Sequence, residues 1–203
     1  AQVVKSLRLK HTNGKLDCLS SPEIIGREKR DVAEHMNSAD GSITSLVQAA
    51  DGSSVKKEKV VVVGAGPAGL FAAIELIKGG FDVVIVERGQ PVEQRGRDIG
   101  ALFNRKILNP NSNLCYGEGG AGTWSDGKLT TRIGKNSEDV RDVLKTLVVH
   151  GAPESILVAG KPHLGTDRLV RILRTLRANL VDSGAEFLFG HTAVDVLVED
   201  GHV

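Results

Sequence analysis

The pattern of apolar and polar residues predicts a βαβ unit over residues 60–87. Residues 60–63 are four consecutive valines, typical of a parallel strand buried on both faces. A second apolar run, 83–86, follows a glycine pair that can end a helix. The segment between the two runs carries apolar residues at helical spacing, namely Leu70, Ile74 and Ile77.

The same pattern predicts further elements on both sides of this unit. We expect a strand over 3–10, a helix over 27–36 with too few apolar residues to bury a face, and a helix over 99–107. Ser137 can cap a helix that Gly151 and Pro153 end, and another helix begins at Thr166-Asp167 and ends at Gly184. Two strands follow, the first with Phe187 and Phe189 and the second over 192–199, and Asp200-Gly201 is typical of a hairpin turn.

The turn after the first valine strand has the composition of a phosphate-binding loop. It reads Gly64, Ala65, Gly66, Pro67, Ala68 and Gly69. The first glycine permits the tight turn, the second lets a pyrophosphate approach the backbone, and Gly69 with Ala73 allows the helix to pack closely on the strand. Pro67 suits the first helical turn, whose free N–H groups and dipole favour an anion.

Glu87 closes the second strand, eighteen residues after Gly69. A carboxylate at about this distance bonds ribose hydroxyls in dinucleotide-binding units. It would repel a 2′-phosphate, so NADP is disfavoured. The alternative is that the glycines serve close packing alone, with no ligand.

A second glycine cluster lies between Tyr116 and Leu129, over residues 117–128. Ordering so many glycines costs entropy, which favours a backbone held close to a bulky or flat group. Thr123, Ser125 and Lys128 offer donors to a phosphate, a ribityl chain or a ring edge. The alternative is a flexible surface loop, against which Trp124 argues.

Composition narrows the function classes. The 203 residues carry a net charge of +1, from 26 basic and 25 acidic residues, so we expect neither nucleic acid nor an anionic membrane as partner. No apolar run is long enough to span a bilayer. Cys18 and Cys115 form no metal-ligand pattern, so we expect no metal site and a reducing compartment. The arginines of the helix from Thr166 predict a solvated face or, less favoured, an anion site.

Five blocks of the sequence resemble one family. They read VVVVGAGPAGLFAAIEL, VIVERG, VEQRGRDI, YGEGGAGTWSDGKLTTR and KPHLGTDRLVRILRTLR. Together they resemble the FAD-dependent dehydrogenases of bacteria and plant plastids, within the glutathione-reductase-like flavoprotein superfamily. The resemblance covers residues 59–203.

This resemblance implies an α/β fold with a Rossmann-like parallel sheet that binds FAD. It places the pyrophosphate at the first glycine loop, the ribose at Glu87, and the flavin side of the cofactor along Gly119, Gly120, Gly122 and Thr123. Arg88 is expected to bind the cofactor as well. It also makes Val194 a backbone contact of the adenine. We expect residues 1–58 to be a polar remnant and linker, and 59–203 to be an FAD-binding domain that continues beyond this sequence.

The function expected is an FAD-dependent oxidoreductase that transfers hydride or electrons to or from a small molecule and an electron acceptor. The alternative is a non-catalytic FAD- or NAD-binding module. No catalytic residue is assigned, although Lys128, Arg97, His163 and Cys115 are candidates, each with a structural role as the simpler interpretation. For His163 that role is a bond to the cap region at Asp167. The plastid stroma is expected from the resemblance, with the cytoplasm as alternative.

Overall fold

The computed structural model describes residues 6–14, 16–20, 58–129 and 137–197. Its strands are β1 (Ser6–His11), β2 (Leu16–Ser20), β3 (Lys59–Val63), β4 (Asp82–Glu87), β5 (Glu186–Phe189) and β6 (His191–Leu197). Its α-helices are α1 (Pro67–Lys78), α2 (Val92–Arg105), α3 (Glu138–Val149) and α4 (Thr166–Asp182). Two short 3-10 helices are η3 (Ala121–Trp124) and η4 (Glu154–Leu157).

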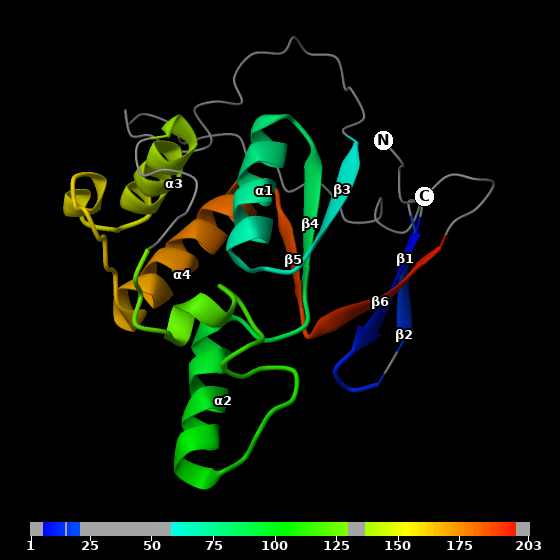
Figure 1. Ribbon diagram of the computed structural model, residues 1–203. Helices are drawn as coiled ribbons and strands as arrows, with labels where there is room; N and C mark the ends of the chain where they lie inside the picture. Colours follow the sequence, from blue (N-terminus) through cyan, green and yellow to red (C-terminus); the bar gives the residue numbers. More distant parts are fainter. Residues whose placement is uncertain (1–5, 15, 21–57, 130–136, 198–203) are drawn as a thin grey trace.

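The strands form two sheets of different kinds. β3, β4 and β5 make a parallel sheet in that order, whereas β2, β1 and β6 make an antiparallel sheet. Helices α1 and α4 lie on one side of the parallel sheet, and the antiparallel strands lie on the other (Figure 1). The predicted α/β fold with a Rossmann-like parallel sheet is therefore confirmed.

The alternation of side chains along β4 explains why other elements pack on both faces of the parallel sheet. Val83 and Ile85 pack into the core formed with α1 and α4, whereas Val84 and Val86 pack with Leu9 of β1. Successive side chains of a strand point to opposite faces. The central strand is therefore buried on both sides, and β1, from the segment predicted as a remnant, covers one of them.

The prediction of burial on both faces is wrong for β3. Its residues are only half-buried and Val63 is 60% exposed. The reason is position, because β3 is an edge strand of the described sheet and β4 is the central one. A valine run identifies a strand but does not say where in the sheet it lies.

Most predicted helices lie where the pattern places them. α3 begins after Ser137, whose Oγ accepts a hydrogen bond from the Val140 N–H at 3.3 Å. α4 carries the predicted apolar face, with Ile172, Leu176 and Leu180 buried. The strand pattern predicted over 3–10 corresponds to β1 where it is described. The helix predicted over 27–36 and the turn at 200–201 lie outside the described residues.

The helix predicted over 99–107 is wrong at both ends. α2 begins at Val92 and ends at Arg105, with Lys106 in the left-handed conformation at φ 58°. Its buried residues are Val92, Arg95 and Ile99, so an arginine occupies a position that the pattern reserves for an apolar residue. Because the first two turns of α2 contain mostly polar residues, the apolar pattern does not indicate where the helix begins.

Candidate functional site

The first glycine loop has the backbone geometry that the sequence predicts. Gly64 adopts φ +101°, and its N–H donates to the Val86 carbonyl at 2.7 Å. A Cβ on Gly69 would overlap the Gly64 carbonyl oxygen, and Ala73 is completely buried. Small residues at these two positions therefore let α1 pack against the turn that leaves β3.

The outer side of this loop is open. Pro67 and Ala68 are exposed, and a Cβ added to Gly66 would have no heavy atom within 4 Å. The loop leads into the first turn of α1, whose N–H groups have no carbonyl one turn back to bond. The helix dipole adds partial positive charge there. The open backbone, the free donors and the dipole fit a pyrophosphate.

Glu87 points its carboxylate at this loop. Its Oε2 accepts the Ala65 N–H at 2.8 Å, and its Oε1 accepts the Gly89 N–H at 2.7 Å. The residue is 7% exposed. Each carboxylate oxygen can accept a second hydrogen bond, so the acid can hold the loop and still receive ribose hydroxyls.

The second glycine cluster lies directly against the first loop. The Gly119 N–H donates to the Ala65 carbonyl at 2.8 Å. A Cβ on Gly120 would lie 3.3 Å from Pro67 Cδ and 3.6 Å from Gly66 Cα. Two segments that are about fifty residues apart in the sequence therefore form one surface, which is open at Gly66.

Arg95 holds the second cluster in place. Its guanidinium is fully buried and donates to five backbone carbonyls at 2.7–3.2 Å, those of Asn113, Leu114, Gly117, Glu118 and Gly120. It also lies 4.8 Å over the Trp124 ring. Burial lowers the pKa of the Arg95 guanidinium, while the charge of Glu87 raises it. An arginine keeps its charge in proteins, so five carbonyl dipoles take the place of its water shell.

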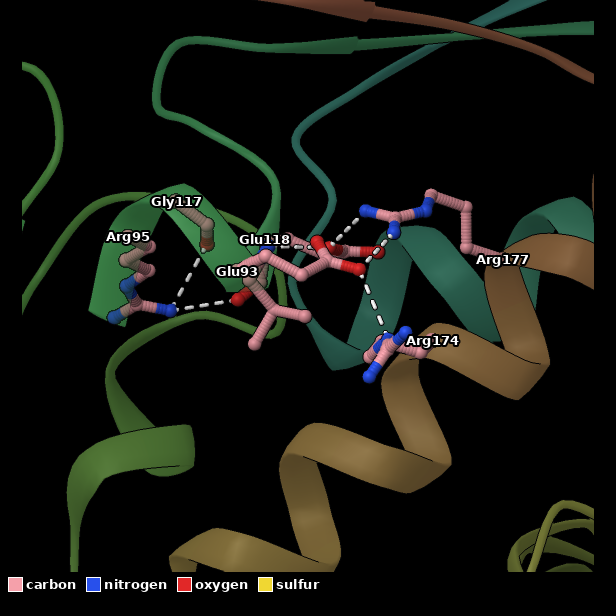
Figure 2. Close-up of polar contacts among 7 residues, drawn as sticks. Glu93, Arg95, Gly117, Glu118, Arg174 and Arg177 are labelled. Carbon is pink, nitrogen blue, oxygen red and sulfur yellow. Dashed lines mark hydrogen bonds and ion pairs between the residues drawn. The ribbon is translucent and has the colours of Figure 1, made fainter. Parts of the chain in front are cut away.

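Glu118 connects the cluster to two helices (Figure 2). The residue has no exposed surface. Its Oε2 accepts the Val92 N–H, at the start of α2, and Nη1 of Arg177 from α4, both at 2.7 Å. Oε1 has no hydrogen-bond partner. Burial raises the pKa of Glu118 to about 7, and nearby Glu93 and Glu87 act in the same direction.

Glu93 completes this ionic network. It pairs with Arg177 at 2.7 Å and with Arg174 at 3.0 Å, and Figure 2 shows both arginines pointing from α4 towards it. Burial opposes its ionisation, yet the hydrogen bond and charge of Arg177 leave the pKa of Glu93 lowered. Part of the predicted arginine face of α4 is therefore an ion-pair network.

The remaining flavin-side residues differ in accessibility. Thr123 is 2% exposed and packs against Gly119, so its hydroxyl faces the protein interior. Gly122 is exposed, with no heavy atom within 4 Å of an added Cβ. Trp124 packs against the main core, which contradicts a flexible surface loop at this point.

The candidate catalytic side chains have ordinary partners. Lys128 pairs with Asp126 at 2.7 Å, with both side chains exposed. The His163 ring bonds the Asp126 carbonyl, so the expected bond to the cap region at Asp167 is wrong. Arg97 and Cys115 are exposed. Nothing in these contacts assigns a catalytic role.

The two residues predicted beside the adenosine lie in different places. Arg88 donates from Nε to Asn111 Oδ1 at 3.1 Å and lies 4.2 Å over the Tyr116 ring. Val194 lies on β6 in the antiparallel sheet and is 47% exposed. Arg88 directly follows Glu87 at the end of the parallel sheet, whereas Val194 belongs to the other sheet.

Sequence analysis missed the two most buried polar residues of the site. Arg95 lies in a stretch of mostly polar residues, and Glu118 lies within the second glycine cluster, where the glycines draw attention away from it. A signal was present for Arg95, because it lies three residues after Val92 and four before Ile99 on a helical period. No sequence signal pairs Glu118 with an arginine 59 residues away.

Two features are absent from the residues that the structure describes. No helix among them has the length and apolar composition to cross a bilayer. Nor do these residues bring three histidine, cysteine or acidic side chains together in a way that could hold a metal ion.

Comparison with known proteins supports a flavin site. Residues 59–96 match the FAD binding domain family. The chain is 39% identical over 145 residues to an uncharacterized protein of Clostridium beijerinckii, covering 71% of this chain and 27% of that protein. It is 32% identical over 104 residues to Monooxygenase CTB7 of Cercospora beticola, covering 48% and 23%. The chain thus spans about a quarter of the length of these relatives.

The family match falls on β3, α1, β4 and the first turn of α2. These are the elements that carry the open glycine loop and Glu87. The match and the geometry agree on the ligand, because both point to an adenine dinucleotide held at the end of a parallel strand. FAD is therefore the cofactor of this Rossmann-like unit, as predicted.

Proposed function

We propose that the protein is an FAD-dependent oxidoreductase that transfers hydride or electrons through a non-covalently bound flavin. The observation that carries this proposal is the contact between the two glycine segments. The Gly119 N–H bonds the Ala65 carbonyl at 2.8 Å, next to an open Gly66. A ligand lying along both segments must extend beyond its pyrophosphate, as FAD does.

The parts of the site have distinct roles in this proposal. The amides at the start of α1 bind the pyrophosphate, and Glu87 orients the ribose. Gly120, which is half-buried, provides a surface without a side chain for the flavin half, whereas Gly119 is buried and joins this segment to the phosphate loop. Arg95 and Glu118 position this surface without contacting the cofactor. The flavin itself supplies the redox chemistry.

The finer features of the proposal rest on sequence resemblance. They are dehydrogenase activity, a small-molecule substrate with a separate electron acceptor, and membership of the FAD-dependent dehydrogenases of bacteria and plastids. Location in the plastid stroma, or alternatively the cytoplasm, has the same basis. The proposal assigns residues 59–203 to the FAD-binding domain. The name of the fungal relative, a monooxygenase, supports flavin redox chemistry but leaves the reaction type open.

A second candidate is a non-catalytic FAD- or NAD-binding module. It is favoured by the contacts of Lys128 and His163, both of which bond Asp126. The second glycine segment argues against an NAD site, because a simple nicotinamide dinucleotide would not need it. Both candidate functions therefore include dinucleotide binding, and they differ in whether the protein converts a substrate.

The experiment is ligand identification combined with redox cycling in the full-length protein. Denaturation should release a molecule with the mass of FAD, and the native protein should show the visible absorbance of an oxidised flavin. That absorbance should bleach with dithionite and return with oxygen or a quinone. Bound FAD that is reduced by no substrate class would favour the non-catalytic module, and release of NAD or of no nucleotide would overturn the proposal.

A further inference from the structure

A groove lies along α4, beside the first turn of α2. Its volume is about 710 Å³, which is within the range of ligand-binding sites. The residues that line it lie between Arg171 and Asp182 of α4, and Glu93 contributes from α2. We name this surface the α4 groove. None of its lining residues belongs to the two glycine segments, so it is separate from the candidate cofactor site.

The sequence of α4 concentrates positive charge along this groove. Between Asp167 and Asp182 the helix carries four arginines, at positions 168, 171, 174 and 177, and no acidic residue. Side chains three positions apart on a helix are neighbours, and like charges in this arrangement repel each other. An anion held between Arg171 and Arg174 would relieve this repulsion.

Glu93 neutralises this charge only in part. It contacts Nε of Arg174 at 3.0 Å and Nη2 of Arg177 at 2.7 Å. A guanidinium has five N–H donors, and the Arg174 side chain is 59% exposed, so its outer edge can still bind an anion. Arg171 is exposed and has no ion pair with any residue in the described part of the chain.

Ion pairs hold the arginine end of the groove in place. Arg177 donates from Nη1 to the buried Glu118 carboxylate and from Nη2 to Glu93, both at 2.7 Å. Figure 2 shows Arg174 and Arg177 pointing from α4 towards Glu93. A ligand that binds Arg174 therefore finds this side chain already ordered, which lowers the entropy cost of binding.

The remainder of the groove has small side chains and then an apolar one. Thr175 and Ala178 are exposed, and Val181 beyond them is 49% exposed. From Arg171 to Val181 the helix rises by about 15 Å, which is the length of about five residues of extended chain. Asp182 disfavours a carboxylate at the Val181 end. The groove therefore fits a short segment with acidic residues at one end and an apolar residue at the other.

We propose that the α4 groove is a docking site for an acidic segment of a partner protein. Two neighbouring carboxylates of this segment bind Arg171 and Arg174, and an apolar side chain a few residues away packs on Val181. Arginine clusters recognise acidic motifs through charge-assisted hydrogen bonds. A free phosphate would use the arginines but not Val181, so the apolar end favours a peptide. The inference involves neither the glycine segments nor FAD and does not depend on the proposed function.

The experiment is calorimetric titration of the full-length protein with the blocked peptide Glu-Glu-Ala-Ala-Leu. We expect a dissociation constant below about 1 mM that rises with salt concentration, because exposed charges are screened. The peptide Gln-Gln-Ala-Ala-Leu should bind at least about tenfold more weakly. Replacing the leucine of the peptide by serine should weaken binding at least about threefold, because the contact with Val181 buries apolar surface.

Matched variants separate the groove from general electrostatic attraction. The double variant Arg171→Gln/Arg174→Gln should raise the dissociation constant for the peptide at least about tenfold. The control Arg141→Gln/Arg168→Gln removes the same charge from exposed positions outside the groove and should change this constant by less than about twofold. Ala178→Trp fills the groove without a change in charge, so it should also weaken binding at least about tenfold.

The Ala178→Trp variant keeps the test independent of the ion pair between Arg174 and Glu93, because it leaves every arginine in place. The inference is wrong if the unmodified protein does not bind the peptide, or if the groove variants bind it as well as the control does. It is also wrong if inorganic phosphate, or vesicles that contain phosphatidylserine, bind through Arg171 and Arg174 more tightly than the peptide.

Discussion

The two glycine segments form one surface, but different kinds of interaction fix the backbone of each. The loop 64–69 is held by the absence of side chains, since a Cβ at Gly69 would overlap the Gly64 carbonyl oxygen. The segment 117–120 is held by buried charge, since Arg95 donates to the carbonyls of Gly117, Glu118 and Gly120. The first depends on residues adjacent in sequence, and the second on a side chain more than twenty residues away.

This difference explains why the sequence predicts the structure of the first glycine segment better than that of the second, although the two segments have similar compositions. In the first loop, Gly64 adopts a positive φ and Gly69 has no room for a Cβ, and both constraints arise within the loop itself. In the second, Gly117 and Gly119 also adopt positive φ and have no room for a Cβ, but the side chains that exclude it include Arg95 and Leu173, which lie far away in the sequence. The comparison predicts that the second segment loses its structure when the distant Arg95 is replaced, and the first when a methyl group is added at Gly69.

The largest effect is expected from Arg95→Met. The variant removes a donor from five carbonyls, of which those of Gly117 and Gly120 keep a backbone donor and those of Asn113, Leu114 and Glu118 do not. Each group left unsatisfied costs about 1–3 kcal/mol. We expect the free energy of unfolding to fall by about 5 kcal/mol, measured by urea denaturation. Arg105→Met, at an exposed position of the same helix, should change it by less than about 0.5 kcal/mol. Equal effects for the two variants would contradict a special role for Arg95.

Gly69→Ala should have the second largest effect on the free energy of unfolding. The added methyl group must displace the Gly64 carbonyl or shift α1 away from β3, and backbone cannot move as a flexible side chain can. We expect a loss of about 4 kcal/mol in the free energy of unfolding, measured in the same way. A variant as stable as the unmodified protein would show that α1 does not pack as closely as described.

Glu118→Gln tests the electrostatics of the second segment. The pKa of Glu118 is raised from 4.5 to about 7 in the folded state, so the folded protein binds more protons than the unfolded chain between these values. Stability from this group is present below pH 4.5 and is lost as the pH rises through 7. The loss is on the order of 3 kcal/mol.

The measurement for Glu118 is urea unfolding at pH 5 and pH 8. The unmodified protein should lose more stability between these values than Glu118→Gln does. Glu154→Gln, at an exposed position in η4, should retain the pH dependence of the unmodified protein. An unchanged pH dependence in Glu118→Gln would mean that this carboxyl ionises normally.

Much of the fold is predictable from the sequence, because local patterns determine it. The valine strand, the proline at the start of α1 and the Ser137 cap each have a local cause, and all are confirmed. The start of α2 was not predictable, since its N–H at Val92 is capped by a carboxylate 26 residues away. The edge position of β3 also depends on distant strands.

The candidate site likewise contains residues that the local sequence predicts and residues that it does not. The open glycine loop and Glu87 follow from spacing, because each residue acts on its neighbours. The positions of Arg95 and Glu118 depend on how the second segment folds over the first. Cofactor contacts at Arg88, Gly122, Thr123 and Val194 remain predictions, and Thr123 is the least accessible of the four.

The most direct measurement of the central claim concerns Gly66, where the smallest change in stability is expected. Gly66 has an extended backbone at φ −77° and open space around it, so Gly66→Ala should alter the free energy of unfolding by less than about 1 kcal/mol. The methyl group would occupy the position where the pyrophosphate approaches. Gly100→Ala, also in open space but on α2, is the matched control. In the full-length protein, titration with FAD should show the dissociation constant rising at least about tenfold for Gly66→Ala and staying constant for Gly100→Ala. Unchanged FAD affinity in a folded Gly66→Ala protein would contradict a pyrophosphate site at this loop.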